Sequence, residues 1–207
     1  MIRTRPPVAC GRDHLAALAE PLRALELEVD RIDAWGRHLA RLLTGGGRLL
    51  VAGNGGSAAQ AQHLTAELVG RYRDERPAMS ALALHAETSS LTAIVNDYGA
   101  ERGFARQVEA HGRPGDVLLA LSTSGRSPNL LAAADAAHAC GLTAWALTGP
   151  RPNPLSDRVS DAVCVDAEAT ATIQEIHQIV VHMVCAAVDV AIGTGRAAPL
   201  AVVAEAR

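Results

Sequence analysis

Residues able to bind a phosphate group cluster in the segment Leu121-Ser-Thr-Ser-Gly-Arg-Ser127, between an apolar run and a helical pattern. The run 116–121 predicts a strand, and the pattern that starts near Asn129 predicts a helix. A helix N-terminus exposes backbone N–H groups that lack intrahelical partners, and its dipole favours an anion. One hydroxyl would suit an ordinary N-cap. The several hydroxyls here favour binding of a phosphate carried by a small molecule: Ser122, Thr123, Ser124 and Ser127.

A second loop rich in glycine, Gly53-Asn-Gly-Gly-Ser57, follows the predicted strand at 48–52. With Ala58 it satisfies the loose dinucleotide fingerprint G-x-G-x-x-A. That fingerprint also needs an acidic residue at the end of the second strand, where this chain has His85. The loop therefore favours approach of the backbone at Gly55 and Gly56 to a sugar phosphate, with Asn54 and Ser57 as hydrogen-bonding side chains, over binding of a nicotinamide cofactor.

Two predicted helices carry side chains capable of acid–base or metal chemistry. His63 and Glu67 share one helix face because they lie four residues apart. The last helix carries further polar groups in an apolar setting, including Gln174, His177 and His182. The set His63, Glu67, Gln174 and His182 suits a metal that accepts N and O ligands, and it equally suits a general acid and base near neutral pH. Interhelical hydrogen bonding is the third interpretation, which the nearby phosphate loop makes less attractive.

The spacing of Gln174 and His182 bears on the number of chains at the site. Eight residues of one helix correspond to about 12 Å of rise, which is a long way for two side chains to reach one centre. A site shared between subunits would relieve this, and the apolar surface of the helical region 13–44 is available for packing. The sequence therefore predicts a homo-oligomer held partly by residues 13–44.

The elements that position these residues form an alternating pattern. Short apolar runs predict strands at 48–52, 79–84, 117–121, 143–147 and 162–165, with helical patterns between them and at 13–44 and 172–192. Such runs are typical of a parallel sheet covered on both faces, so we expect a doubly wound α/β fold with ligands at the carboxyl ends of the strands. The chain fits a single domain, with an α/β core at 48–192 and a tail at 194–207 that we expect to be mobile.

Composition excludes several classes of function. The net charge of −3 and the scarcity of aromatic residues argue against nucleic-acid binding. Every basic residue is Arg, so neither a Schiff-base lysine nor the lysine of a P-loop NTPase is present. We find no signal peptide and no membrane-spanning pattern, because polar residues interrupt the apolar segment 176–192. We expect a soluble, cytoplasmic protein with free thiols.

Several separated motifs, taken together, resemble the phosphoheptose isomerases of the sugar isomerase (SIS) domain superfamily. They are G-N-G-G-S at 53–57, A-Q-H-x-x-x-E at 61–67, N-D at 96–97, S-T-S-G-x-S at 122–127 and I-Q-E-x-H at 173–177. The resemblance spans roughly residues 13 to 192. It implies a five-stranded parallel sheet between helices, a homotetramer with sites at subunit interfaces, and conversion of sedoheptulose 7-phosphate to D-glycero-D-manno-heptose 7-phosphate.

The resemblance also implies roles for single residues. The substrate-binding residues would be Asn54, Gly55, Gly56, Ser57, Asn96, Asp97, Ser122, Thr123, Ser124, Ser127 and Gln174. The catalytic carboxylate and histidine would be Glu67 and His182, and zinc would be bound by His63, Glu67, Gln174 and His182. No nucleotide cofactor is implied. The mechanism we expect is an enediol isomerisation with Glu67 as base and His182 as acid, or one in which zinc on these residues polarises the carbonyl.

One departure from the family pattern leaves the sugar open. An Asp-Arg pair often precedes I-Q-E in the family, and this chain has Ala171 and Thr172 there. An isomerase of another sugar phosphate is therefore an alternative. A second alternative is a non-enzymatic phosphosugar-binding or replication-initiator-associating protein of the same superfamily. That branch typically lacks the catalytic pair, so the presence of Glu67 and His182 favours an enzyme.

Overall fold

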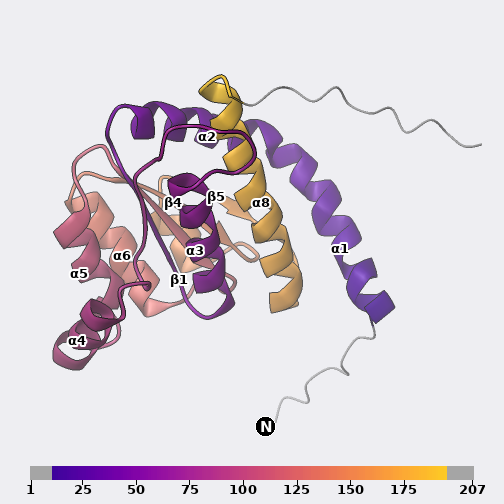
Figure 1. Ribbon diagram of the computed structural model, residues 1–207. Coiled ribbons are helices and arrows are strands. Elements are labelled where there is room, and N and C mark those ends of the chain that lie inside the picture. The colour runs from indigo at the N-terminus through magenta and orange to yellow at the C-terminus, as the bar shows by residue number, and fades with distance from the viewer. Residues whose placement is uncertain (1–10, 195–207) are drawn as a thin grey trace, which may run out of the picture.

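The computed structural model describes residues 11–194 and shows a central sheet between two layers of helices (Figure 1). The strands are β1 (Leu49–Gly53), β2 (Ala81–Ala83), β3 (Val117–Ser122), β4 (Thr143–Thr148) and β5 (Asp161–Cys164). All neighbouring strands are parallel, in the order β2-β1-β3-β4-β5. The predicted five-stranded parallel α/β fold is therefore confirmed.

Helices cover both faces of the sheet. They are α1 (Gly11–Leu25), α2 (Val29–Thr44), α3 (Gly56–Val69), α4 (Thr88–Tyr98), α5 (Arg102–His111), α6 (Pro128–Ala139), α7 (Pro154–Arg158) and α8 (Thr170–Ala191), with a 3₁₀ turn at Glu26–Glu28. Alternate strand residues face opposite layers: Leu49 and Val51 lie in the core with α2, α3 and α8, whereas Leu50 and Ala52 lie in the core with α5 and α6. The sheet thus buries both of its faces.

The strand order reverses between β1 and β3. The chain leaves β1 toward the edge strand β2, and from β3 it proceeds in the other direction to β4 and β5. Gly53 at the end of β1 is in register with Leu121 near the end of β3, so the two loops that follow start side by side. In open parallel sheets such a switch point is where ligands bind. Both loops with predicted phosphate-binding residues begin there.

Some boundaries differ from expectation for local reasons. The strand expected at 79–84 is only Ala81–Ala83, because β2 is an edge strand that pairs with β1 alone. The expected helical region 13–44 consists of α1 and α2, separated by the 3₁₀ turn. The short helix α7 was not expected, although Asn153 caps it and Pro154 occupies its first turn. Apart from Thr194, the expected tail lies outside the described residues.

Helix α8 is a core element. Of the described helices it alone is long and apolar enough to cross a membrane by length and composition, and 56% of that apolar window is buried inside the protein. It packs against α2 and α3 (Figure 1), and Val180, Val184 and Val188 are buried there. Its hydropathy is explained by this packing.

Candidate active site

The loop between β3 and α6, residues 122–127, is called the hydroxyl loop below. Hydrogen bonds from its own side chains hold its shape. Ser122 Oγ accepts a hydrogen bond from the Gly125 N–H at 3.1 Å, and Ser124 Oγ accepts one from the Arg126 N–H at 3.2 Å. Ser127 is the N-cap of α6, but its side chain makes no capping hydrogen bond and lies 3.4 Å from Ser122 Oγ. Pro128, the first residue of α6, has no N–H, and the Leu130 N–H donates to the Ser127 carbonyl at 3.0 Å. The Ser127 hydroxyl and the Asn129 N–H are therefore the groups of this turn that remain for an anion.

The side chain of Asn153, the residue that caps α7, packs against this loop at Gly125. Gly125 has a φ of +60°, and a Cβ built on it would lie 2.0 Å from Asn153 Oδ1, so only glycine fits. The buried Asn153 side chain donates to Thr148 Oγ1 at 3.2 Å and accepts from the Ser156 N–H at 2.9 Å. The Leu155 N–H donates to the Gly125 carbonyl at 3.0 Å. The loop is thus held at a defined position before any ligand arrives.

The glycine loop after β1 is tied to the hydroxyl loop by two amides. Asn54 Nδ2 donates to Asn129 Oδ1 at 3.0 Å, and Asn129 Nδ2 donates to Asn54 Oδ1 at 2.9 Å. Asn129 was not among the predicted site residues, although its place in the first turn of α6 is a signal that could have found it. Gly56, at the start of α3, lies against the side chain of Gln174, which leaves no room for a Cβ.

The predicted acid–base residues meet at the imidazole of His63. His63 Nε2 lies 3.1 Å from His182 Nε2 and 3.3 Å from Glu67 Oε1. The other carboxylate oxygen, Glu67 Oε2, is buried and has no hydrogen-bond partner in the part of the chain that the structure describes. Residues from α3 and α8 that are more than a hundred positions apart in sequence are therefore brought into direct contact. A carboxylate and an imidazole so placed are suited to move protons on a bound substrate.

Two further residues complete this cluster. The ring of Tyr72 stacks on His182 with a centroid distance of 5.8 Å. Gln178 Nε2 lies 3.2 Å from His182 Nε2, one helical turn before it on α8. Neither was assigned to the site from the sequence, although the spacing of four residues between Gln178 and His182 is the signal that predicts their contact.

The fourth predicted metal ligand, Gln174, lies elsewhere. Its side chain contacts Gly56, and its backbone carbonyl accepts a hydrogen bond from Gln60 at 2.5 Å. Across residues 11–194, no three His, Cys, Asp or Glu side chains are arranged as a complete metal site. Zinc binding by His63, Glu67, Gln174 and His182 therefore stays a prediction.

Asn96 and Asp97 lie in the last turn of α4 and are exposed. Asn96 Nδ2 donates to Asp97 Oδ1 at 2.8 Å. Within the described part of the chain, no hydrogen bond or ion pair joins either residue to the other predicted site residues. The structure thus leaves their predicted role in substrate binding without a contact that supports it.

His177, also noted in the sequence, has a structural role. It is fully buried in α8, and its Nε2–H donates to the Thr148 carbonyl at 3.1 Å. Burial lowers the pKa of His177 to about 4, so the ring is neutral near neutral pH. It supports the end of β4 beneath the hydroxyl loop. At the position where the family pattern has charges, Ala171 is exposed and Thr172 is buried with an unpartnered hydroxyl.

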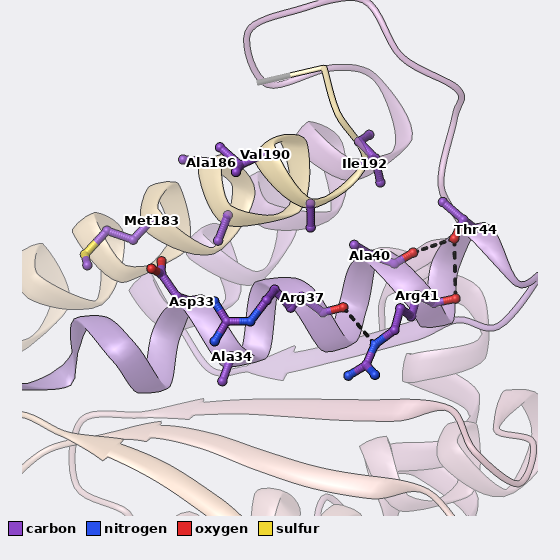
Figure 2. A pocket seen from close by; sticks show the side chains of 12 residues that line it. Asp33, Ala34, Arg37, Ala40, Arg41, Thr44, Met183, Ala186, Val190 and Ile192 are labelled. Atoms are coloured by element: carbon purple, nitrogen blue, oxygen red, sulfur yellow. Dashed lines mark hydrogen bonds between the residues drawn. The ribbon is translucent and has the colours of Figure 1, made fainter. Parts of the chain in front are cut away.

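A groove of about 1020 Å³ lies between α2 and α8, away from these loops. Figure 2 shows side chains of both helices around it; the lining is mainly apolar, with Arg37, Arg41 and Asp33 on α2. Val190 and Met183 line it from α8. None of the residues predicted to bind substrate or metal lines this groove. Its apolar character is typical of packing surfaces more than of sugar-phosphate sites.

Within one chain, the site has two separated parts. The glycine loop lies at the start of α3, with the hydroxyl loop joined to it through the Asn54–Asn129 pair, and Glu67 lies near the end of α3. From Gly56 to Glu67 the helix rises by about 16 Å. On α8, Gln174 lies beside the start of α3, where it contacts Gly56, whereas His182 lies beside a later turn of α3 and contacts His63. The loops and the acid–base cluster are thus found at different ends of the α3–α8 pair.

Comparison with known proteins places this arrangement in a family context. The SIS domain family model matches residues 13–149. The phosphoheptose isomerase of Streptomyces coelicolor is 62% identical over 190 residues, which cover 92% of this chain and 81% of that protein. The solved phosphoheptose isomerase from Neisseria gonorrhoeae has 37% identity and a TM-score of 0.79, covering 86% of this chain and 96% of that one. For the enzyme from Francisella tularensis the identity is 33% and the TM-score 0.77, with 87% and 99% covered.

Proposed function

This chain belongs to the phosphoheptose isomerases of the SIS domain family, and from that premise we propose that it interconverts sedoheptulose 7-phosphate and D-glycero-D-manno-heptose 7-phosphate. One observation carries the proposal: Glu67 and His182 both lie within 3.3 Å of His63 Nε2, so a carboxylate and an imidazole share one small site. An aldose–ketose isomerase needs such a pair to move one proton between carbons and one between oxygens.

The proton transfers are assigned by the chemistry of the two groups. In the ketose-to-aldose direction, Glu67 removes a proton from C1, and the electrons of that C–H bond form the C1–C2 double bond of a cis-enediol. Glu67 then returns the proton to C2. His182 moves the proton of the O1 hydroxyl to O2, so that the carbonyl passes from C2 to C1. Glu67 Oε2 has no hydrogen-bond partner among the described residues, so it is the carboxylate oxygen that His63 does not engage.

The phosphate end of the sugar is assigned to the hydroxyl loop. The Ser127 side chain makes no capping hydrogen bond, and together with the Asn129 N–H it suits a phosphate oxygen. Asn153 and the Asn54–Asn129 pair fix the position of the loop. A phosphate bound there would orient the reacting carbons of the sugar relative to the acid–base residues.

Zinc is a further part of the proposal. Two imidazoles and a carboxylate are typical zinc ligands, and Glu67 keeps a buried oxygen without a partner in the cluster. When bound by His63, Glu67 and His182, zinc would polarise the carbonyl and enediol oxygens. Gln174 would have to turn away from Gly56 to join them. A Glu67 side chain that ligates a metal would no longer be a free base.

We also propose a homo-oligomer, with the tetramer as the expected form. Leu15 and Leu27, in and just after α1, are 69% and 87% exposed, which leaves an apolar surface without a partner among residues 11–194. The groove between α2 and α8 is a second such surface. The separation of the loops from the acid–base cluster supports a site completed by a neighbouring subunit. The cytoplasm remains the expected location.

The isomerase is tested with Glu67→Gln and His182→Ala. We expect both variants to lose turnover of sedoheptulose 7-phosphate and deuterium uptake from D₂O at the carbon alpha to the carbonyl, measured by NMR. Circular dichroism should show that the fold survives. Normal turnover in either variant would contradict the assignment. Exchange with a different phosphosugar alone would identify another substrate in the same reaction class.

Sharing of the site is tested by mixing two inactive variants. Ser127→Asp keeps a good N-cap but places a negative charge where the phosphate binds, and Glu67→Gln removes the base. If each site combines the loop of one subunit with the Glu67 of another, mixed oligomers should recover up to about a quarter of wild-type turnover. No recovery after verified subunit exchange would show that each site belongs to one chain.

A further inference from the structure

Arg76 is a buried cation in the segment that connects α3 to β2. Its Nε donates to Asp189 Oδ1 of α8 at 2.9 Å, and the two side chains are 0% and 3% exposed. A buried charge is costly unless its polar atoms have partners, and Asp189 Oδ2 has none among the described residues. The contacts of the remaining guanidinium nitrogens show where the other partners of Arg76 are.

The guanidinium binds the carboxyl end of α3. Arg76 Nη2 donates to the Glu67 carbonyl at 2.5 Å, and Nη1 donates to the carbonyls of Leu68 at 2.9 Å and Pro77 at 3.2 Å. The last carbonyls of a helix lack intrahelical donors, and a cation there is favoured by the helix dipole. Arg76 therefore caps α3 at Glu67 itself and joins that turn to α8.

The contacts of Arg76 with the last carbonyls of α3 and with Asp189 of α8, called the clasp below, join the two helices that carry Glu67 and His182. Glu67 is in the turn whose carbonyls Arg76 binds, and Asp189 follows His182 on α8 by seven residues, which is close to two helical turns. Cys185 lies between them on α8, and burial, then the charges of Glu67 and Asp189, raise the pKa of its thiol to about 12. The clasp thus sets how the end of α3 lies against the part of α8 that presents His182.

We propose that Arg76 is a positioning residue for the reaction, which holds Glu67 in register with His182 through the Glu67 carbonyl and Asp189. This inference rests on the proposed function, in which Glu67 is the base. A buried ion pair is often no more stabilising than apolar residues of similar size, so stability alone does not account for an Arg–Asp pair at this place. Proton transfer, in contrast, is sensitive to small errors in placement.

The test replaces the pair by apolar side chains. In Arg76→Met combined with Asp189→Leu no buried charge is left unpaired, but the carbonyls of Glu67, Leu68 and Pro77 lose their donor. We therefore expect the protein to fold, with a thermal unfolding midpoint lowered by about 5 to 10 °C. We expect kcat to fall by at least about tenfold and KM to change by less than about threefold, because the phosphate loop is untouched. Amide hydrogen exchange at residues 66–69 should become faster. A kcat within threefold of wild type would overturn the proposal.

Asp189→Asn is the matched control. Asn keeps an oxygen that accepts from Arg76 Nε, so the carbonyl contacts remain while the ion pair is lost. We expect kcat within about threefold of wild type even if the protein is less stable. A loss of kcat equal to that of the double variant would assign the effect to the unpaired buried charge and not to the carbonyl contacts, which would overturn the proposal.

Arg76→Lys is the second variant, and it keeps the buried charge should the double variant fail to fold. A single ammonium group cannot reproduce the planar fork of donors, so we expect a lower kcat with an unchanged KM. Full kcat in this variant would overturn the proposal. Glu67→Gln is assayed in parallel: turnover there contradicts the proposed function, whereas a normal kcat in the Arg76 variants with an inactive Glu67→Gln contradicts the clasp alone.

Discussion

Asn54 and Asn129 exchange two hydrogen bonds, at 3.0 and 2.9 Å, across the point where the strand order reverses. Each amide donates once and accepts once, so the pair has a defined orientation. One residue belongs to the loop after β1 and the other to the first turn of α6. The pair therefore holds together the loop after β1 and the loop before α6, although the chain continues from them to opposite sides of the sheet.

Removal of this pair should weaken substrate binding more than chemistry. In Asn129→Ala the Asn54 amide loses both partners and the two loops are free to separate. We expect KM for the sugar phosphate to rise by about tenfold, with kcat reduced by less than about threefold. Steady-state kinetics measures this. Asp135→Asn, an exposed change on the same helix, should leave both constants unchanged, and an equal effect there would contradict the role of the pair.

Gly125→Ala should disturb the hydroxyl loop through Asn153. The added Cβ would meet Asn153 Oδ1 at 2.0 Å in a backbone region with positive φ. The matched control is Gly115→Ala, where φ is also positive but no atom lies within 4 Å. We expect the control to cost about 1 kcal/mol in urea unfolding from backbone strain alone, and Gly125→Ala to cost at least about 2 kcal/mol more and to abolish phosphate binding. An equal loss of unfolding free energy in the two variants would show that the Asn153 side chain moves aside without cost and would contradict this prediction.

His177 should make the protein sensitive to mild acid. Its folded pKa of about 4 lies below the ordinary value of 6.5, so between these values the unfolded chain binds a proton that the folded chain does not. This contribution to stability is fully present above pH 6.5 and is lost as the pH falls toward 4. His177→Gln keeps a donor for the Thr148 carbonyl but does not titrate. Between pH 7.5 and 4.5, wild type should lose about 2 to 3 kcal/mol more free energy of unfolding than the variant. Parallel losses would refute this role.

Zinc binding should depend on the imidazoles of the cluster. We expect wild-type protein to retain zinc after dialysis, and His63→Ala and His182→Ala to lose it, as measured by metal analysis and by calorimetric titration. Gln62→Ala, an exposed change next to His63, should bind as wild type does. A chelator should abolish turnover and added zinc should restore it. Zinc content that is the same in all four proteins would place the metal elsewhere or remove it from the mechanism.

The strands, and the loop between β3 and α6, could be predicted from the sequence because their signals are local. A continuous apolar run such as 117–121 identifies a buried strand wherever it lies in the chain. The hydroxyls of Ser122 and Ser127 act on the helix that follows them directly. The contact of His63 with Glu67 is likewise set by one helical turn. In these cases, a few consecutive residues are enough to indicate the strand, the start of the helix and the contact within one helical turn.

The edge strand and the helix pair α1–α2 show where local signals become inaccurate. The apolar run at 79–84 is longer than β2, because the length of an edge strand depends on its single neighbour β1. Whether one or two helices fill 13–44 depends on how Leu25 and Ile32 are buried against the rest of the molecule. Such boundaries are decided by packing partners that are distant in the chain.

Tertiary structure alone decided which polar residues meet. Each contact of Asn129 with Asn54, of His63 with His182 and of Arg76 with Asp189 joins residues at least 75 positions apart. Side-chain type and spacing within one helix do not specify such partners, since they follow from the strand order and from the packing of α3 on α8. For this reason the sequence could nominate residues for phosphate binding and acid–base chemistry, whereas only the folded chain separated Gln174 from His182 and placed Arg76 against the Glu67 carbonyl.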